Sequence, residues 1–209
     1  MYEDFILAIR KYEEKLGIWS GSDHQTPIAN GNIQARLRMI YLYNLASIYN
    51  GLVMDTDNLT ENNLGYFTIH GDVGDFNPIG GLWKTEVFEL ASWLISEYYK
   101  QYTFNNPEND IEVFAKIQAI VESLKLKPTA GLGITNNDLE ELEAESYDQV
   151  DTILQEILAW KSMTKESSWN LKNFLDDQQF LNIPYKVVEA VAKRHFASEF
   201  KREQLPIKI

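Results

Sequence analysis

The chain has 209 residues, a formal net charge of −12 at pH 7 and no cysteine. This length allows one domain with a sizeable core, while the negative charge disfavours a general surface for nucleic acid or anionic membrane. The lack of cysteine excludes thiol catalysis, thiolate metal sites and disulfides, and no apolar run approaches the ~18 residues of a membrane span. We therefore expect a soluble cytoplasmic protein.

Two helices are predicted in the first quarter of the chain. Residues 2–16 place apolar and charged positions at the spacing of a surface helix. Residues 32–49 are apolar on almost every side, which is typical of a helix at the centre of a fold or at an interface. Arg36 and Arg38 are embedded in this second helix, and a buried arginine needs an anionic partner. That partner is a carboxylate of the chain or an anionic ligand, unless the side chains extend to water.

A short apolar run at residues 51–54 predicts a buried strand of the parallel type, and the polar stretch 55–85 follows it. In open α/β sheets, ligands bind at the carboxyl ends of such strands. Asn58 or Thr60 is expected to cap a short helix that has Glu61 in its first turn. The 55–85 stretch combines Asp, Asn, Gly and Thr with aromatic residues. This mixture fits a backbone held close to a ligand, and it also fits a long irregular connection.

The second half of the chain is predicted to form helices joined by loops. Thr85 is expected to cap the first of them, Ser146 to open a capping box, and Pro184 to begin the last helix. His195 is expected to lie at the end of that helix rather than to bind a ligand. The acidic run at 136–148 is a solvated loop or a divalent-metal cluster. The predicted inward positions are Val87, Leu90, Ala91 and Leu94; Ile111, Phe114, Ile117, Ile120 and Val121; Val150, Ile153, Leu154, Ile157 and Leu158; and Val187, Val188 and Val191.

Four segments together resemble the ammonia-dependent NAD synthetase family. They are GNIQARLRM at 31–39, the 55–84 stretch with its GYFT turn and Lys-Thr end, KPTAG at 127–131, and SEFKREQLP at 198–206. Their order is that of the family, and the resemblance covers about residues 29–206. It implies a single α/β domain over 1–209, the helix-dominated remainder of a Rossmann-like, adenine nucleotide alpha-hydrolase-like parallel-sheet fold. Only one or two strands are expected in the chain, and residues 1–28 are expected to form a divergent lead-in helix and turn.

The resemblance also implies a reaction. ATP would adenylate the carboxylate of deamido-NAD with release of pyrophosphate, and ammonia would displace AMP to give NAD. Magnesium would neutralise the triphosphate as pyrophosphate leaves, and hydrogen-bond donors would hold the second substrate in line. The family is a homodimer with deamido-NAD near the subunit contact, which suits an apolar helix at 32–49.

The resemblance assigns seven site residues and no catalytic acid or base. Hard carboxylate oxygens are what magnesium prefers, and a lysine near the nucleotide would contact its phosphates. The seven are Thr56, Lys84 and Thr129 for ATP, Glu61 for Mg²⁺, and Arg36, Asp75 and Lys201 for deamido-NAD.

The chain departs from the family pattern at several positions. Ile69 stands where the family usually has a lysine, Phe200 where it has a histidine, and Asp75 is assigned by allowing a one-residue gap. The family's Ser-Gly-Gly-x-Asp-Ser loop, which grips pyrophosphate with backbone amides, has no counterpart in the sequence. We therefore expect the amino-terminal part of the family fold to be absent.

This absence leaves three readings of the function open. In the first, a separate chain supplies the phosphate loop and the two together form an active enzyme. In the second, the chain is an inactive dimerising or nucleotide-binding remnant. In the third, it belongs to a related ATP-using enzyme that amidates another acid.

Overall fold

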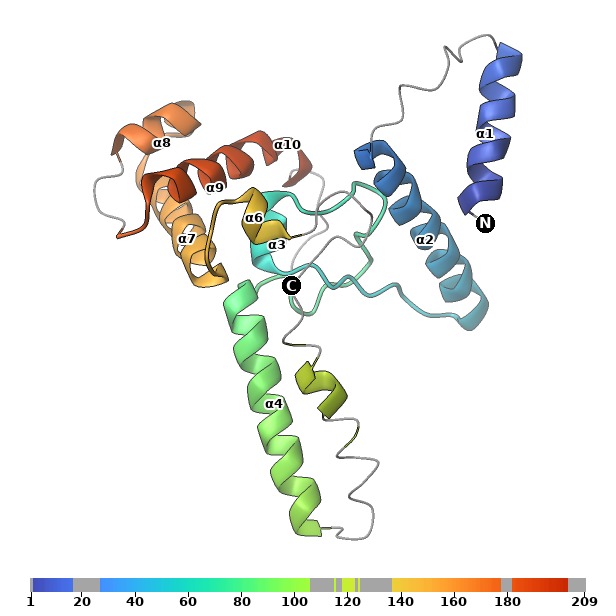
Figure 1. The fold of residues 1–209 in the computed structure, drawn as a ribbon, viewed down its shortest axis with the longest axis horizontal. Helices are drawn as coiled ribbons and strands as arrows, with labels where there is room; N and C mark the ends of the chain where they lie inside the picture. Colours follow the sequence, from blue (N-terminus) through green and yellow to red (C-terminus); the bar gives the residue numbers. More distant parts are fainter. Residues whose placement is uncertain are drawn as a thin grey trace.

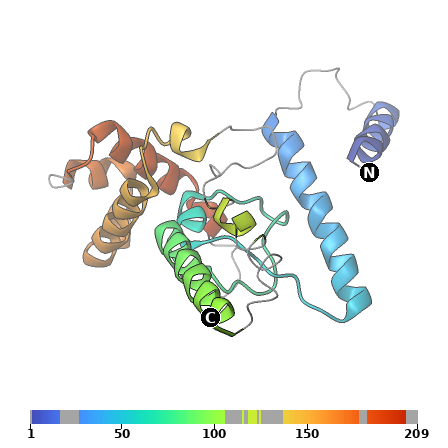
Figure 2. The same cartoon turned by 60° about the horizontal axis from the view of Figure 1, so that its bottom comes forward.

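The computed structural model describes residues 2–16, 27–105, 115, 118–122, 124, 137–177 and 182–202. Helices dominate this part of the chain (Figure 1). Their bounds are α1 (Tyr2–Leu16), α2 (Pro27–Tyr49), α3 (Leu59–Leu64), α4 (Lys84–Asn105), α6 (Asp138–Glu141), α7 (Tyr147–Met163), α8 (Leu171–Asp177), α9 (Tyr185–Ala197) and α10 (Glu199–Arg202), with a 3-10 turn, η1 (Glu166–Ser168). Helices α3, α7, α8, α9 and α10 pack as one body, whereas α2 and the far end of α4 extend away from it (Figures 1 and 2).

The hydrophobic core lies between α7 and α9. Side chains at helical spacing on both helices are fully buried there, as the sequence pattern predicts. Its members are Leu64, Leu142, Tyr147, Val150, Ile153, Leu154, Ile157, Trp160, Phe174, Val187, Val188, Val191 and Ala192. The prediction is wrong for Leu158, which is 37% exposed, because it lies about 100° around the helix from Ile157.

Aromatic side chains attach α8 to this core. The ring of Trp160 meets that of Phe174 edge-on, with centroids 5.6 Å apart, and Phe196 of α9 packs against both. Trp160 Nε1 also donates a hydrogen bond to a carboxylate oxygen of Asp177 at 2.8 Å. The indole N–H is therefore satisfied while the ring is buried, which stabilises the packing of α8 against α7.

The predicted helix starts are confirmed in part. Pro184 is the N-cap residue of α9, and Ser146 is the N-cap residue of α7. The capping box at Ser146 is wrong, because its hydroxyl makes no cap bond and Gln149 accepts from the amide of Glu145 instead. Helix α4 begins at Lys84, so Thr85 lies inside the first turn and is not its N-cap.

The predicted strand at 51–54 is reduced to a single pairing. Met54 forms an isolated parallel bridge with Phe76, and no strand is assigned anywhere among the described residues. The amide of Asp55 donates to the carbonyl of Phe76, and the amide of Asp75 donates to that of Val53, each at 2.8 Å. A Cβ at Gly74 would lie 2.5 Å from the Val53 carbonyl oxygen, so only glycine permits this close approach. The helix-dominated prediction is confirmed, whereas that of one or two strands is not.

Helix α2 presents apolar side chains to solvent. Arg36 and Arg38 are both exposed, so neither is a buried charge that requires an anionic partner. The large apolar side chains of α2 that are exposed are Ile28, Ile40, Tyr41, Leu42, Tyr43, Ile48 and Tyr49. A helix that is apolar on most sides and solvent-exposed in one chain suits an interface.

Helix α4 also departs from its predicted packing. Leu90 is 41% exposed and Leu94 is 52% exposed, so the inward stripe predicted for this helix is wrong. The reason is geometric, because α4 meets the core body at its amino-terminal end and then extends past it (Figure 1). The helix predicted near 110–124 lies partly outside the described residues, including Ile111, Phe114 and Ile117. No described helix is long and apolar enough to cross a membrane.

Two leucines of α7 provide a test of this core. Replacing the fully buried Leu154 with alanine is expected to lower the free energy of unfolding by ~2–5 kcal/mol, because the cavity it leaves cannot collapse fully. The matched change Leu158→Ala, one turn along the same helix, is expected to cost about 1 kcal/mol or less. Urea denaturation followed by circular dichroism measures both, and equal losses would contradict the α7–α9 core.

Candidate functional site

The candidate site is built on α3, a helix of six residues whose two ends are both capped. At its amino end, Asn58 Oδ1 accepts from the amide of Glu61 at 3.0 Å, and Glu61 Oε2 accepts from the amide of Asn58 at 2.9 Å. At its carboxyl end, Gly65 adopts a left-handed φ of 67°. A Cβ at Gly65 would clash with Ser198, so glycine is required here by both conformation and space. These caps fix the direction of the Glu61 side chain, and they confirm the predicted helix and its first-turn acid.

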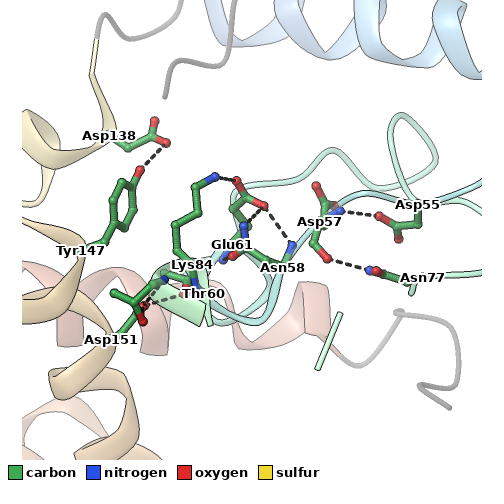
Figure 3. A network of polar contacts seen from close by, with 11 residues as sticks. Asp55, Asp57, Asn58, Thr60, Glu61, Asn77, Lys84, Asp138, Tyr147 and Asp151 are labelled. Atoms are coloured by element: carbon green, nitrogen blue, oxygen red, sulfur yellow. Dashed lines mark hydrogen bonds and ion pairs between the residues drawn. The ribbon is translucent and has the colours of Figure 1, made fainter. Parts of the chain in front are cut away.

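Lys84 and Glu61 form an ion pair at the amino ends of α4 and α3. Lys84 Nζ lies 2.6 Å from Glu61 Oε1, and the two side chains are 14% and 21% exposed. The ammonium also lies 5.7 Å from the ring centroid of Tyr147 and 5.9 Å from that of Phe88. Figure 3 shows Lys84 and Glu61 pointing toward one another across the site. Two residues predicted to bind ATP and Mg²⁺, 23 positions apart in sequence, are therefore in direct contact.

Two aspartates lie beside this pair on the loop that leads into α3. Asp55 is buried and accepts from the amide of Asp57, while Asn77 donates to the carbonyl of Asp57 at 2.7 Å (Figure 3). Burial and then the charge of Asp55 raise the pKa of Asp57 to about 8, with Glu61 adding to the effect and Lys84 opposing it. One carboxylate oxygen of Asp57 is buried without a hydrogen-bond partner. The loop therefore holds a carboxyl group whose charged form is disfavoured by its surroundings.

A second polar pair lies across from Lys84. The hydroxyl of Tyr147 donates to a carboxylate oxygen of Asp138 at 3.3 Å (Figure 3). Burial raises the pKa of both groups. The charge of Asp138 raises the pKa of Tyr147 further, whereas the hydrogen bond from Tyr147 opposes the rise in the pKa of Asp138. Sequence reasoning missed Tyr147, which the core pattern of α7 concealed, and it treated Asp138 only as part of an acidic run. Among the described residues of that run and elsewhere, no group of three or more His, Cys, Asp or Glu side chains is placed to hold a metal.

The residues present fit magnesium only as part of a nucleotide complex. Glu61 is one hard carboxylate, and it is already partly neutralised by Lys84. Magnesium usually binds proteins through one or two carboxylates, keeps several waters and takes its remaining ligands from substrate phosphates. A single carboxylate with an orphaned carboxylate oxygen of Asp57 nearby is compatible with that mode, and it is too few ligands for a site built from protein alone.

The residues predicted for the second substrate gather around another part of the same loop. Arg36 Nε donates to the carbonyl of Ile69 at 3.3 Å, and Lys201 Nζ donates to the carbonyls of Gly65 and Phe67 at 2.8 and 2.6 Å. Burial, and then the charge of Arg194, lowers the pKa of Lys201. Two predicted cations, one from α2 and one from α10, are therefore both bonded to the backbone of residues 65–69.

Asp75 joins this loop to α2. Its carboxylate accepts from the hydroxyl of Tyr43 at 2.9 Å and from the amide of Val53 at 3.0 Å. Thr56 is exposed at the start of the loop, between Asp55 and Asp57 in sequence. Thr129 lies outside the described residues. The structure thus brings Glu61 and Lys84 together. It bonds Arg36 and Lys201 to the 55–85 segment, and it bonds Asp75 of that segment to Tyr43 and Val53.

A buried histidine attaches the carboxyl-terminal helices to α3. His195 Nδ1 lies 3.1 Å from the carbonyl oxygen of Asn63, and Arg202 donates to the same oxygen at 2.7 Å. Burial, and then the charges of Arg202 and Lys161, lowers the pKa of His195 from 6.5 to about 3. His195 therefore acts as a neutral structural donor near the end of α9, as predicted, and it holds α10 and its Lys201 beside the loop.

Comparisons with known proteins place these residues in context. A family model described as NAD synthase matches residues 7–205. The chain is 34% identical over 180 residues to an NH(3)-dependent NAD(+) synthetase of Methanocaldococcus jannaschii, covering 86% of this chain and 56% of that protein. It is 31% identical over 193 residues to one of Helicobacter hepaticus, covering 92% and 60%. A solved structure of NMN synthetase from Francisella tularensis matches with a TM-score of 0.59 and 27% identity, covering 100% of this chain and 62% of that chain.

These matches cover the relatives incompletely. Against a third relative, the NH(3)-dependent NAD(+) synthetase of Thermoplasma volcanium, the chain is 40% identical over 130 residues and covers 44% of its length. The chain thus spans between 44% and 60% of these curated relatives. The solved relative supports a Rossmann-like fold class for the matched part.

The buried state of His195 leads to a pH-dependent prediction. Between pH 6.5 and about 3 the unfolded chain binds a proton at this residue and the folded chain does not, so stability falls as the pH falls through this window. The contribution is fully present above pH 6.5. Replacing His195 with glutamine is expected to remove up to ~1.4 kcal/mol per pH unit from that slope. Urea denaturation of both proteins between pH 4.5 and 7.5 measures it, and parallel curves would exclude a neutral buried histidine.

Proposed function

The chain belongs to the NAD synthase family, and we propose that it takes part in the ATP-dependent amidation of deamido-NAD to NAD with ammonia, through an adenylated intermediate. The observation that carries this proposal is the Lys84–Glu61 pair at 2.6 Å. The resemblance assigns these two residues to the triphosphate and to its magnesium, and their proximity supports the assignment. We also propose that residues 1–209 form a single domain and that the protein works in the cytoplasm.

The ion pair supports a specific role for each partner. Both side chains keep some exposure, 14% for Lys84 and 21% for Glu61, so a ligand can reach the pair and exchange its own charges for theirs. In the proposed complex, the Lys84 ammonium would bind triphosphate oxygens in place of Glu61, and the Glu61 carboxylate would hold magnesium. Bound magnesium supplies neutralisation of the charge that develops on the leaving pyrophosphate. Thr56 and Thr129 would both contact the nucleotide.

The second substrate would lie against residues 65–75. Arg36 donates to the Ile69 carbonyl through Nε, and an arginine side chain has four further N–H donors. Lys201 directs two of its three donors to carbonyl oxygens, which are neutral, so its charge is not cancelled by them. Both cations are therefore suited to the phosphates of deamido-NAD. Asp75, held by Tyr43, would accept from a hydroxyl of the same substrate.

Completing the reaction requires hydrogen-bond donors that bind the leaving pyrophosphate. The sequence contains no Ser-Gly-Gly-x-Asp-Ser loop, so this element would come from polypeptide outside residues 1–209. A longer form of this protein or a separate chain would provide it. The alternative is that the chain binds nucleotide or dimerises without catalysis.

A second candidate function concerns the acid that is amidated. The structural relative named NMN synthetase covers the whole of this chain, and Ile69 replaces a lysine that the family usually uses for deamido-NAD. These two observations favour a smaller substrate, the mononucleotide acid whose amide is NMN. The same ATP and magnesium residues would serve either reaction.

We predict that the 209-residue chain binds ATP in a magnesium-dependent manner and does not form NAD alone. Isothermal titration calorimetry with ATP, with and without Mg²⁺, measures the first part. Glu61→Gln is expected to remove the magnesium dependence and Lys84→Met to weaken binding at least about tenfold, an effect of ~1.4 kcal/mol. Glu89→Gln, at an exposed position of α4, is the control.

The second part is measured by coupled formation of AMP and NAD from deamido-NAD, ATP, Mg²⁺ and ammonia. NAD formed by the chain alone would show that no further phosphate loop is needed. Preference for nicotinic acid mononucleotide over deamido-NAD, once that loop is supplied, would select the second candidate. No ATP binding at any magnesium concentration would contradict the proposed function.

We further predict that the chain self-associates through α2. Ile40 is 65% exposed at the middle of that helix, and burying such a side chain in a homodimer would remove it from water. Ile40→Lys is expected to weaken the dimer at least about tenfold, whereas Leu94→Lys on exposed α4 leaves it unchanged. Light scattering at micromolar concentration measures the mass, and a monomeric wild-type chain would refute this prediction.

A further inference from the structure

Asp151 lies beneath the two segments that carry Glu61 and Lys84. It follows Val150 in α7 and is 2% exposed. Its Oδ1 accepts from the hydroxyl of Thr60 at 2.5 Å, and its Oδ2 accepts from the amide and the hydroxyl of Thr85 at 3.0 and 2.8 Å. Figure 3 shows this carboxylate directed at the start of α4 from below. One side chain of α7 thus contacts both α3 and α4.

The hydroxyl of Thr60 extends the network to Lys84. It donates its hydrogen to Asp151 and accepts from the amide of Lys84 at 2.8 Å. Because the Lys84 amide can only donate and the Asp151 carboxylate accepts, the hydroxyl has one orientation that satisfies both. Each residue of the candidate ion pair is therefore next in sequence to a threonine that Asp151 binds: Thr60 precedes Glu61, and Thr85 follows Lys84.

The location also explains how α4 begins. The first amides of a helix lack intrahelical partners, and a carboxylate near them is favoured by the helix dipole. The amide of Thr85 lies in the first turn of α4, and Asp151 supplies its acceptor from another helix. Burial raises the pKa of Asp151, and the hydrogen bonds from Thr60 and Thr85 oppose that rise. The carboxylate is therefore costly to bury, and its bonds to α3 and α4 are what compensate it.

We propose that Asp151 is a positioning residue of the nucleotide site, which sets the placement of Glu61 relative to Lys84 through Thr60 and Thr85. It touches neither member of the ion pair. What that pair binds rests on the proposed function, but the placement itself can be measured without any ligand. A purely structural role would affect only the stability of the α3–α4–α7 contact.

The test compares variants that each remove or restore one group of the Asp151–Thr60 network. Asp151→Asn keeps the shape but removes the charge, Thr60→Val removes the relay hydroxyl, and Thr60→Ser restores it. Asp148→Asn makes the same charge change at an exposed position of the same helix, so it is the matched control. Circular dichroism establishes that each variant is folded before any comparison. Because Thr60→Val alters no charge, it keeps the test valid where Asp151→Asn fails to fold.

The ligand-free measurement is the ¹³C resonance of the Glu61 carboxyl group. Lys84→Met defines its position when Glu61 has lost its partner. Thr60→Val and Asp151→Asn are expected to move the resonance toward that position, while Thr60→Ser and Asp148→Asn leave it at the wild-type value. A resonance unchanged in both folded Thr60→Val and Asp151→Asn would overturn the proposal.

Binding of magnesium and ATP, measured by calorimetry on the folded proteins, is the second readout. Affinity is expected to fall at least about tenfold in Thr60→Val and Asp151→Asn, to recover in Thr60→Ser, and to stay within about twofold of wild type in Asp148→Asn. Wild-type affinity in both disrupted variants would overturn the positioning role. If the wild-type chain binds no nucleotide while the Glu61 resonance still moves as expected, the proposed function fails and the positioning role stands.

Discussion

The geometry of the candidate site depends on how the surrounding helices hold α3. A helix of six residues is far below the ~12–15 residues at which isolated helices become even marginally stable. Its stability comes from tertiary contacts, with Leu64 fully buried in the α7–α9 core and the carbonyl of Asn63 accepting from both His195 and Arg202. The position of Glu61 therefore depends on the packing of α3 against α7 and α9, which are remote from it in sequence.

The charge distribution around α3 explains why a metal–nucleotide complex suits this site better than free ATP. Asp55, Asp57 and Asp138 all have raised pKa values, each primarily because of burial. Lys84 pairs with Glu61, and its charge opposes the rise in the pKa of Asp57 and of Asp138. The Glu61 carboxylate would repel a free triphosphate, whereas a triphosphate that carries magnesium is attracted to carboxylate oxygens.

The sequence was informative wherever a local pattern decided the structure. Helical spacing identified the buried faces of α7 and α9, and the cap residues of the loop predicted α3 with Glu61 in its first turn. Predictions from the sequence were wrong where the structure depends on how distant segments pack together. The spacing of Leu90 and Leu94 has the form of a core stripe, but α4 leaves the body after its first turns and that face has no described neighbour to bury it. The strand at 51–54 failed for a related reason, since its hydrogen bonds depend on the distant segment at 75–76.

The same distinction applies to the polar residues of the site. Asp151 had one local signal, an acid within the apolar positions of α7, but spacing alone could not show that its partners would be Thr60 and Thr85. Asp151 and Glu61 differ in burial and in their hydrogen-bond partners. Asp151 is 2% exposed and bound by three donors, so removing any one of them leaves a buried charge poorly compensated.

Glu61 is held on one side by its cap and on the other by a lysine that remains partly open to water. Its partner can be exchanged for a ligand, because a ligand that carries both charges would replace the ion pair on each side. A carboxylate that is fully compensated by its own chain has no capacity left for a ligand, whereas one paired with a replaceable cation does. This difference assigns fixed geometry to Asp151 and ligand exchange to Glu61 and Lys84.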